Sequence, residues 1–111
     1  MTHTPLPDEL LIDAALLGVF DPRELLNPDS TGYQHELALL AALSVEVPFG
    51  GAWLWALSDD ARRTGLALLP PPGPERTARL TRTRPRDKDE TALALRDLLA
   101  PKPAPDLRQL L

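Results

Sequence analysis

The chain has 111 residues, 43% of them hydrophobic, no cysteine, and a formal net charge of −4 at pH 7. This length suits one small domain with a tail, the hydrophobic content argues against a fully disordered chain, and the missing cysteines exclude disulfides and thiol chemistry. No apolar run reaches the roughly 18–20 residues that cross a bilayer, and no signal peptide is visible. We therefore expect a cytoplasmic protein without a membrane partner.

Residues 8–18 have the signals of a helix. Asp8 and Glu9 suit the positive end of the helix dipole, and Gly18 is a natural stop. The apolar arc of this helix is wide, which predicts packing against two neighbours; its members are Leu10, Leu11, Ile12, Ala14 and Leu17.

A capping signal follows directly. Asp21 is placed to cap a helix, Pro22 suits the first helical position, and Glu24 can complete a capping box. Pro28 forbids a long continuation, so this helix is expected to be short. A second long helix is then predicted over residues 31–44.

The middle of the chain alternates in the manner of strands. Residues 44–47 and 52–57 predict a hairpin, and Pro48 restricts its first arm to a sheet edge. Trp53 and Trp55 share one strand face. Two tryptophans in a small domain favour a place in the core over a protein-binding patch.

A third helix is predicted over residues 59–69, with Ser58 as its cap. Gly65 costs helix stability, so it is expected to mark close packing. Arg62 and Arg63 are expected to point away from the inner face.

Prolines at 70–74 end that helix. Residues 75–84 alternate threonine, arginine and apolar side chains, which predicts a strand that pairs with 52–57 as a small wing. Residues 87–100 predict a final helix. Residues 106–111 look like the start of a further helix, as expected if the chain were cut from a longer protein.

Charge divides the chain in two. Residues 1–70 carry a net charge of −7 and residues 71–111 a net charge of +3. Six bases lie within residues 76–88, where guanidinium groups could bind phosphate or could face the acidic helices of the same molecule. No aromatic residue interleaves them, and the overall charge is negative; both facts weaken a nucleic-acid interpretation.

Catalytic and metal-binding patterns are missing. The two histidines, His3 and His35, lack the spacing of a metal site or a triad, and the dipole of a helix explains acid pairs such as Asp59 and Asp60. No nucleotide-binding loop is present. We expect no enzyme activity, no cofactor and no metal.

The order of the predicted elements resembles a winged-helix domain of the α+β class, mostly helical, with a two- or three-stranded sheet and a C-terminal helical tail. It would occupy residues 1–86, with the proline linker 70–74 inside it and 87–111 as the tail. The analogy makes 59–69 the recognition helix and 75–86 the wing. Asp59 and Asp60 would then oppose the DNA backbone.

A more specific pattern lies in residues 53–63, which read WLWALSDDARR, and in 89–111, which contain LRDLL before a proline linker. It resembles the winged-helix-like N-terminal module of large bacterial STAND-type signalling ATPases from conflict and defence systems. The ATPase motif itself is missing here. The resemblance implies an adaptor that recruits or senses a partner for a larger machine.

The leading hypothesis is a non-catalytic protein-interaction module, and the alternative is a DNA-binding winged-helix domain of a regulator. In the first case the partner is a protein, acidic or part of a larger polypeptide. The predicted contact residues are Arg62, Arg63, Arg76, Arg79, Arg82, Arg84, Arg86 and Lys88. Because Arg79 and Arg82 are both expected at the surface, replacing both with Glu should spare the fold.

Overall fold

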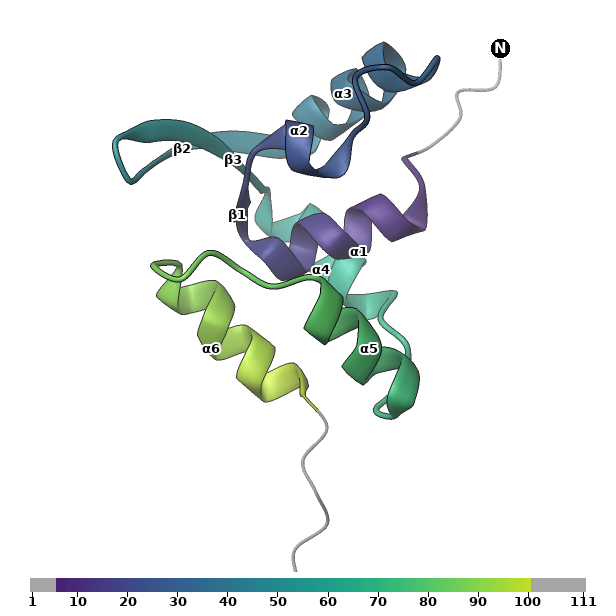
Figure 1. Ribbon diagram of the computed structural model, residues 1–111, viewed down its shortest axis with the longest axis vertical. Helices are drawn as coiled ribbons and strands as arrows, with labels where there is room; N and C mark the ends of the chain where they lie inside the picture. Colours follow the sequence, from purple (N-terminus) through teal and green to yellow (C-terminus); the bar gives the residue numbers. More distant parts are fainter. Residues whose placement is uncertain (1–5, 101–111) are drawn as a thin grey trace, which may run out of the picture.

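The computed structural model describes residues 6–100 and has an α+β architecture, in which helices surround a small antiparallel sheet (Figure 1). In chain order the elements are α1 (Asp8–Leu17), β1 (Val19–Phe20), α2 (Pro22–Leu25), α3 (Tyr33–Ala42), β2 (Ser44–Phe49), β3 (Ala52–Leu57), α4 (Asp59–Ala67), α5 (Pro74–Arg82) and α6 (Glu90–Leu99). The predicted α+β class is confirmed.

Local signals in the sequence account for most helix ends. Gly18 ends α1 with a φ of 73°, and the Ser58 hydroxyl accepts a hydrogen bond from the Ala61 amide at the start of α4. Asp21 caps α2 by accepting from the Arg23 amide at 2.9 Å. The expected capping role of Glu24 is wrong, because its carboxylate pairs with Arg86 instead.

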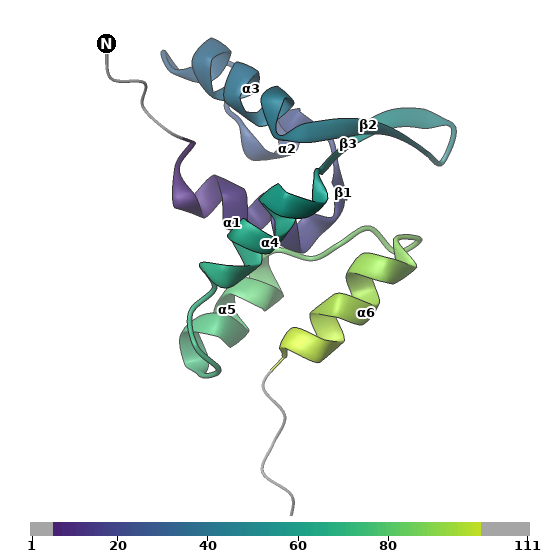
Figure 2. The same ribbon diagram turned by 180° about the vertical axis from the view of Figure 1, so that it is seen from behind.

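The sheet has the strand order β1-β3-β2, so the predicted hairpin is confirmed and β2 is an edge strand. Gly50 and Gly51 form its two-residue turn with φ values of 59° and 82°, which side chains other than glycine rarely adopt. The other neighbour of β3 is β1, which pairs Phe20 with Trp55. The hairpin projects sideways beyond the helices (Figures 1 and 2).

Helix α1 lies between two hydrophobic clusters, as its wide apolar arc predicts. Ala14 and Ala15 are fully buried beneath α4, where Gly65 lets the two helices approach: a Cβ on Gly65 would lie 2.7 Å from the Leu11 carbonyl oxygen. The first cluster joins α1 to α2, α3 and the sheet. The second consists of Ile12, Leu16, Leu69 and Leu80.

The strand predicted over residues 75–84 is wrong, because the structure has helix α5 there. Gly73 precedes the helix, and Pro74 occupies its first turn, a favourable position for proline. The arginine and apolar residues of this segment also recur at the three- and four-residue spacing of a helix. Positions 76, 79, 80 and 83 fall on one inward face and are buried or half-buried.

The final helix is confirmed within residues 87–100. Asp89 caps α6 by accepting from the Ala92 amide, and its second carboxylate oxygen accepts from the Val19 amide at 3.0 Å. This buried carboxylate therefore links α6 to β1. The helix predicted from residue 106 lies outside the described residues.

Candidate functional site

The structure divides the eight predicted contact residues into a group that is bonded internally and a group that is exposed. Arg79 belongs to the first group. It is only 8% exposed, and its guanidinium donates to the Glu9 carboxylate, to the Glu9 carbonyl at 2.9 Å and to Asp13 Oδ1 at 3.1 Å. Thr83 also donates to Asp13. The expectation that Arg79 is exposed is wrong, because the carboxylates of α1 hold it inside.

Arg76 and Arg86 are also engaged within the molecule. Arg76 donates to the Pro70 carbonyl at 2.7 Å, which closes the proline loop against α5. Arg86 forms an ion pair with Glu24, and hydrogen bonds from the Arg86 guanidinium to that carboxylate raise the pKa of Arg86 above its ordinary value. Both arginines therefore join segments of the fold to one another.

Arg62 was expected to point away from the inner face of its helix, and this is wrong. Its Nε donates to the Ala15 carbonyl at 3.2 Å, and its Nη2 is buried. Arg62 lies where α4 crosses α1, so its guanidinium is part of that helix contact.

The exposed group consists of four residues, namely Arg63, Arg82, Arg84 and Lys88. Arg63 lines a different pocket from Arg82 and Arg84. Arg63 faces Asp60 at 3.9 Å, while Arg82 and Arg84 line a surface pocket together with Asp13 and Glu24. Both carboxylates are already paired with other arginines, Asp13 with Arg79 and Glu24 with Arg86, so they do not neutralise Arg82 and Arg84.

Within residues 6–100, no group of three or more His, Cys, Asp or Glu side chains is arranged to hold a metal ion. Over the same range no helix has both the length and the apolar composition needed to cross a membrane. His35 is exposed on α3, and His3 lies outside the described residues.

The hairpin formed by β2 and β3 presents an apolar surface to solvent. Among residues 44–57, Glu46 is the single charged side chain and Ser44 the other polar one. Trp53 is 70% exposed and Val45 is 52% exposed. A core position for Trp53 is therefore wrong, whereas Trp55 does pack against the first hydrophobic cluster.

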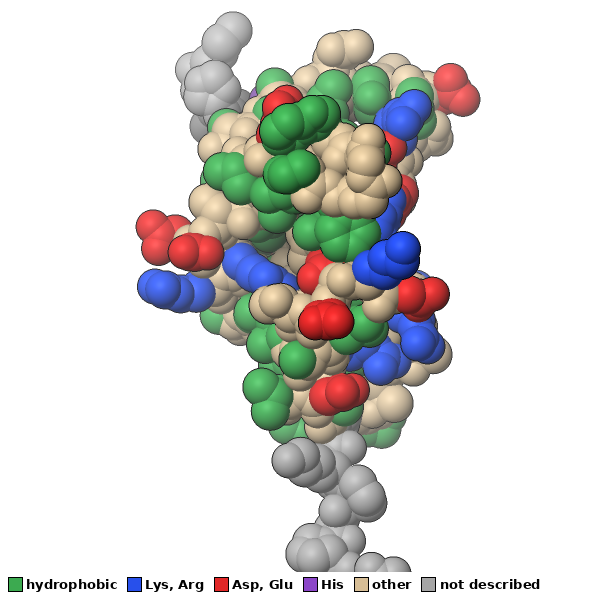
Figure 3. All heavy atoms as spheres, turned by 90° about the vertical axis from the view of Figure 1, so that its left-hand side faces the viewer, with side chains coloured by type: hydrophobic (Ala, Val, Ile, Leu, Met, Phe, Trp, Pro, Cys, Tyr) green, Lys and Arg blue, Asp and Glu red, His purple; other side chains and the backbone are tan. Residues whose placement is uncertain are grey.

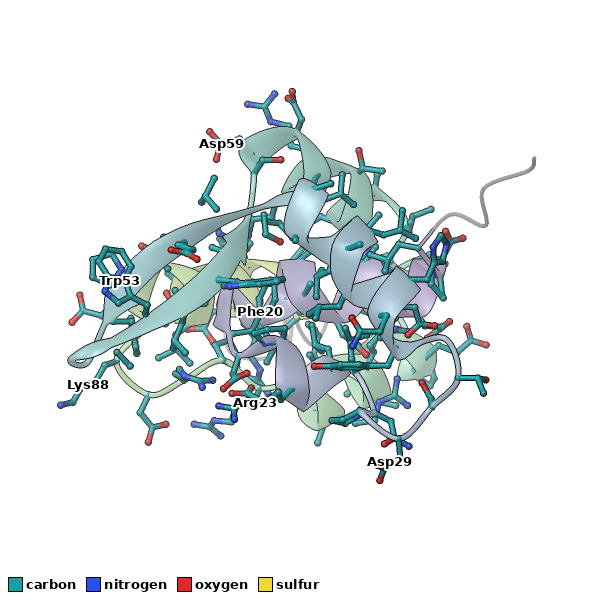
Figure 4. The ribbon with its side chains drawn as sticks, turned by 90° about the horizontal axis from the view of Figure 1, so that it is seen from above. Phe20, Arg23, Asp29, Trp53, Asp59 and Lys88 are labelled. Carbon is teal, nitrogen blue, oxygen red and sulfur yellow. The ribbon has the colours of Figure 1, made fainter. Side chains whose placement is uncertain are left out.

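The strand register explains this difference between the two tryptophans. Trp53 and Trp55 lie on one face of the hairpin. Their cross-strand partners on β2, Pro48 and Glu46, lie on the same face. Near the base, Phe20 pairs with Trp55 and the first cluster covers that face. The first cluster does not extend to the tip of the hairpin. Trp53 lies on the projecting part, away from the buried Phe20 (Figure 4).

The opposite face of the hairpin is apolar as well. The register places Val45, Val47, Phe49, Leu54 and the two alanines of β3 on it. Hydrophobic side chains gather in the upper half of the molecule, seen from the side toward which the hairpin projects, and a band of charged side chains lies beneath them (Figure 3). The hairpin therefore exposes apolar groups on both faces.

A small groove adjoins this surface. It is lined by Ala41 at the end of α3, by Ser44, Val45 and Glu46 of β2, and by Trp55, and its volume is about 100 Å³. Ser44 Oγ donates to the Leu40 carbonyl at 2.7 Å, which attaches the start of β2 to the end of α3. The groove is thus formed by two elements that are held together.

The electrostatic character of this end of the molecule is acidic. Residues 24–61 contain neither Lys nor Arg but six acidic residues, namely Glu24, Asp29, Glu36, Glu46, Asp59 and Asp60. Helix α3 and the hairpin both fall within this range. The exposed bases Arg82, Arg84 and Lys88 come from α5 and the loop before α6. The absence of Lys and Arg from residues 24–61 is visible in the sequence and is a signal by which the hairpin could have been recognised as an apolar, acidic surface.

No protein-family model, no curated protein and no solved structure matches the chain.

Proposed function

We propose that this chain is a non-catalytic protein-interaction module of the adaptor type, in keeping with its resemblance to modules of bacterial signalling and defence proteins. Its contact surface is the hairpin of β2 and β3 together with the adjoining end of α3. The observation that carries the proposal is a projecting hairpin with a single charge in residues 44–57 and a tryptophan that is 70% exposed.

Exposed apolar side chains on a projecting hairpin carry a physical cost. They gain nothing from burial, and they promote association with other chains. A large exposed aromatic ring such as that of Trp53 is also typical of binding hot spots. A partner that covers Trp53 and Val45 would remove this apolar surface from water.

The topology supports a winged-helix-like arrangement for residues 8–57, although not with the assignments expected from the sequence. A helix, a short strand, two helices and a hairpin follow in order, and the short strand pairs with the second arm of the hairpin. In this arrangement α3 takes the place assigned to residues 59–69, and the hairpin takes the place assigned to residues 75–86.

This same arrangement disfavours the DNA-binding alternative. Binding to duplex DNA depends on Lys and Arg contacts with phosphates. Neither α3 nor the hairpin carries such a residue, and Glu36 and Glu46 would be repelled. A labelled random duplex at low salt is expected to show no binding in fluorescence anisotropy. Tight binding that weakens steeply with salt would instead support the DNA-binding alternative.

Site-specific photo-crosslinking of the full chain tests the proposed surface. A photoreactive amino acid replaces Val45 in one version and Leu98 in the other, so that Trp53 is kept in both; Val45 is 52% exposed, and Leu98, 74% exposed on α6, serves as a matched control. We expect the same identified protein to be crosslinked from position 45 and not from position 98. An excess of unmodified chain should compete for it. Equal yields from both positions, or none from position 45, would overturn the proposal.

A further inference from the structure

We infer that the hairpin surface recognises a basic segment of another protein, in which Arg or Lys stands beside aliphatic side chains. This inference rests on the proposed function and adds the chemistry of the partner. Trp53 provides an aromatic face for the cation and its hydrocarbon stem, and Glu46 provides the counter-charge.

The two side chains share one face of the hairpin. Glu46 lies opposite Trp55 and Pro48 lies opposite Trp53, so Glu46 and Trp53 are diagonal neighbours across the strand pair. Diagonal neighbours are within reach of long and aromatic side chains. A guanidinium or ammonium group over the Trp53 ring could therefore also contact the Glu46 carboxylate.

Glu46 is available for such a contact. It is exposed, and no hydrogen bond or ion pair joins its carboxylate to another of the described residues. The other acids of the molecule that face arginines, such as Asp13 and Glu24, already have partners within the fold. Neither the hairpin nor α3 carries a Lys or Arg that could pair with Glu46.

The cost of covering Glu46 selects among partners. Glu46 also lines the groove beside Ala41 and Trp55, so a partner that covers the groove takes this carboxylate out of water. A purely apolar partner would leave it buried without a counter-charge, which is strongly unfavourable. An acidic partner would add repulsion. A partner with Arg or Lys at this point satisfies the carboxylate while its aliphatic side chains fill the groove that Val45 and Trp55 also line.

A selection from a displayed library of random 12-residue peptides tests the inference with the full chain as bait. Peptides that also bind the Trp53→Ala variant are removed. We expect the enriched peptides to be basic, with Arg or Lys next to Leu, Ile or Val. Trp53→Ala should weaken their binding at least about tenfold. Glu46→Gln should weaken it by a smaller factor and reduce its dependence on salt. Leu98→Ala should have no effect.

Three outcomes would overturn the inference. Enriched peptides that depend on Trp53 but are neutral or acidic, and do not respond to Glu46→Gln, would exclude a basic partner and leave the interaction module standing. A library without any Trp53-dependent peptide would also contradict it. Light scattering that shows a dimer, lost on Trp53→Ala and on Arg84→Glu, would make a second copy of this chain the occupant. Circular dichroism of each variant checks that its fold is intact.

Discussion

The α5–α6 region and the β2–β3 hairpin use their side chains in opposite ways. The α5–α6 region is rich in arginine. Four of the arginines predicted to contact a partner, one of them in α4, instead form bonds within the molecule: Arg62, Arg76, Arg79 and Arg86. The hairpin is apolar, yet Trp53 and Val45 face solvent. A charged run thus stabilises the fold, whereas an apolar run leaves large side chains in contact with solvent.

The physical reason lies in the distribution of acids. Helix α1 places Glu9 and Asp13 one turn apart, so both carboxylates meet the guanidinium of Arg79 from α5. The negative first part of the chain and the positive later part therefore attract each other within the molecule. The hairpin carries no Lys or Arg, so Glu46 has no counter-charge on the hairpin itself.

The largest expected effect comes from breaking the internal network. Arg79→Glu would place three carboxylates together in a part-buried site, so we expect a loss of roughly 3 kcal/mol or more in the free energy of unfolding. Arg82→Glu, on the same helix but exposed, should cost well under about 1 kcal/mol. Urea denaturation of the two variants provides the comparison.

This expectation replaces the one drawn from the sequence, in which the double replacement of Arg79 and Arg82 spared the fold. Arg79→Glu would instead account for nearly all of the loss in the double variant. Equal effects of the two single replacements would show that Arg79 is not held by α1.

The two tryptophans divide the hairpin into a structural base and a free tip. Trp55→Ala removes a ring that packs on the core, and we expect a loss of about 3 kcal/mol in the free energy of unfolding. Trp53→Ala should change it by only about 0.5 kcal/mol, because that ring is 70% exposed. Thermal melts of both variants measure the difference. A large loss from Trp53→Ala would mean that the tip is packed and unavailable to a partner.

The contact between α1 and α4 holds Arg62 in place and depends on Gly65. A Cβ added there would lie 2.7 Å from the Leu11 carbonyl oxygen and 2.9 Å from the Ala15 Cβ. Gly65→Ala should therefore destabilise by about 1–3 kcal/mol, despite the better helix propensity of alanine. Gly32→Ala is the matched control, since its nearest neighbour would be 3.7 Å away. Equal chemical stability of both variants would show that the helices can separate without cost.

Helix caps, turn glycines and the hairpin could be predicted from the sequence because each depends on a few adjacent residues. Asp21, Ser58 and the Gly50–Gly51 turn are examples. The strand expected at 75–84 was wrong because the spacing of its apolar and arginine residues also fits a helix. The helix is favoured in the fold because the carboxylates of α1 pair with Arg79. Strand β1 has two residues and no periodic signal, so the partner of β3 could not be found from the sequence. Trp53 is exposed because the first hydrophobic cluster reaches Trp55 but not the tip of the hairpin, and this limit is set by the tertiary fold.

The smallest effect concerns the exposed pair of Asp21 and Arg23 at the start of α2. Hydrogen bonds from the Arg23 side chain and amide lower the pKa of Asp21 below its ordinary value of 3.8. A carboxylate with a lowered pKa in the folded state stabilises the protein above its ordinary pKa, and this contribution is lost as the pH falls through the folded value. Glu9, Asp13 and Glu24 also face arginines, so Asp21→Asn is compared with the parent chain to isolate one group. The variant should lose slightly less stability than the parent between about pH 5 and pH 3. If the free energy of unfolding changes with pH equally in the variant and the parent, Arg23 stabilises the Asp21 carboxylate equally in the unfolded chain. The two residues are also neighbours in sequence there.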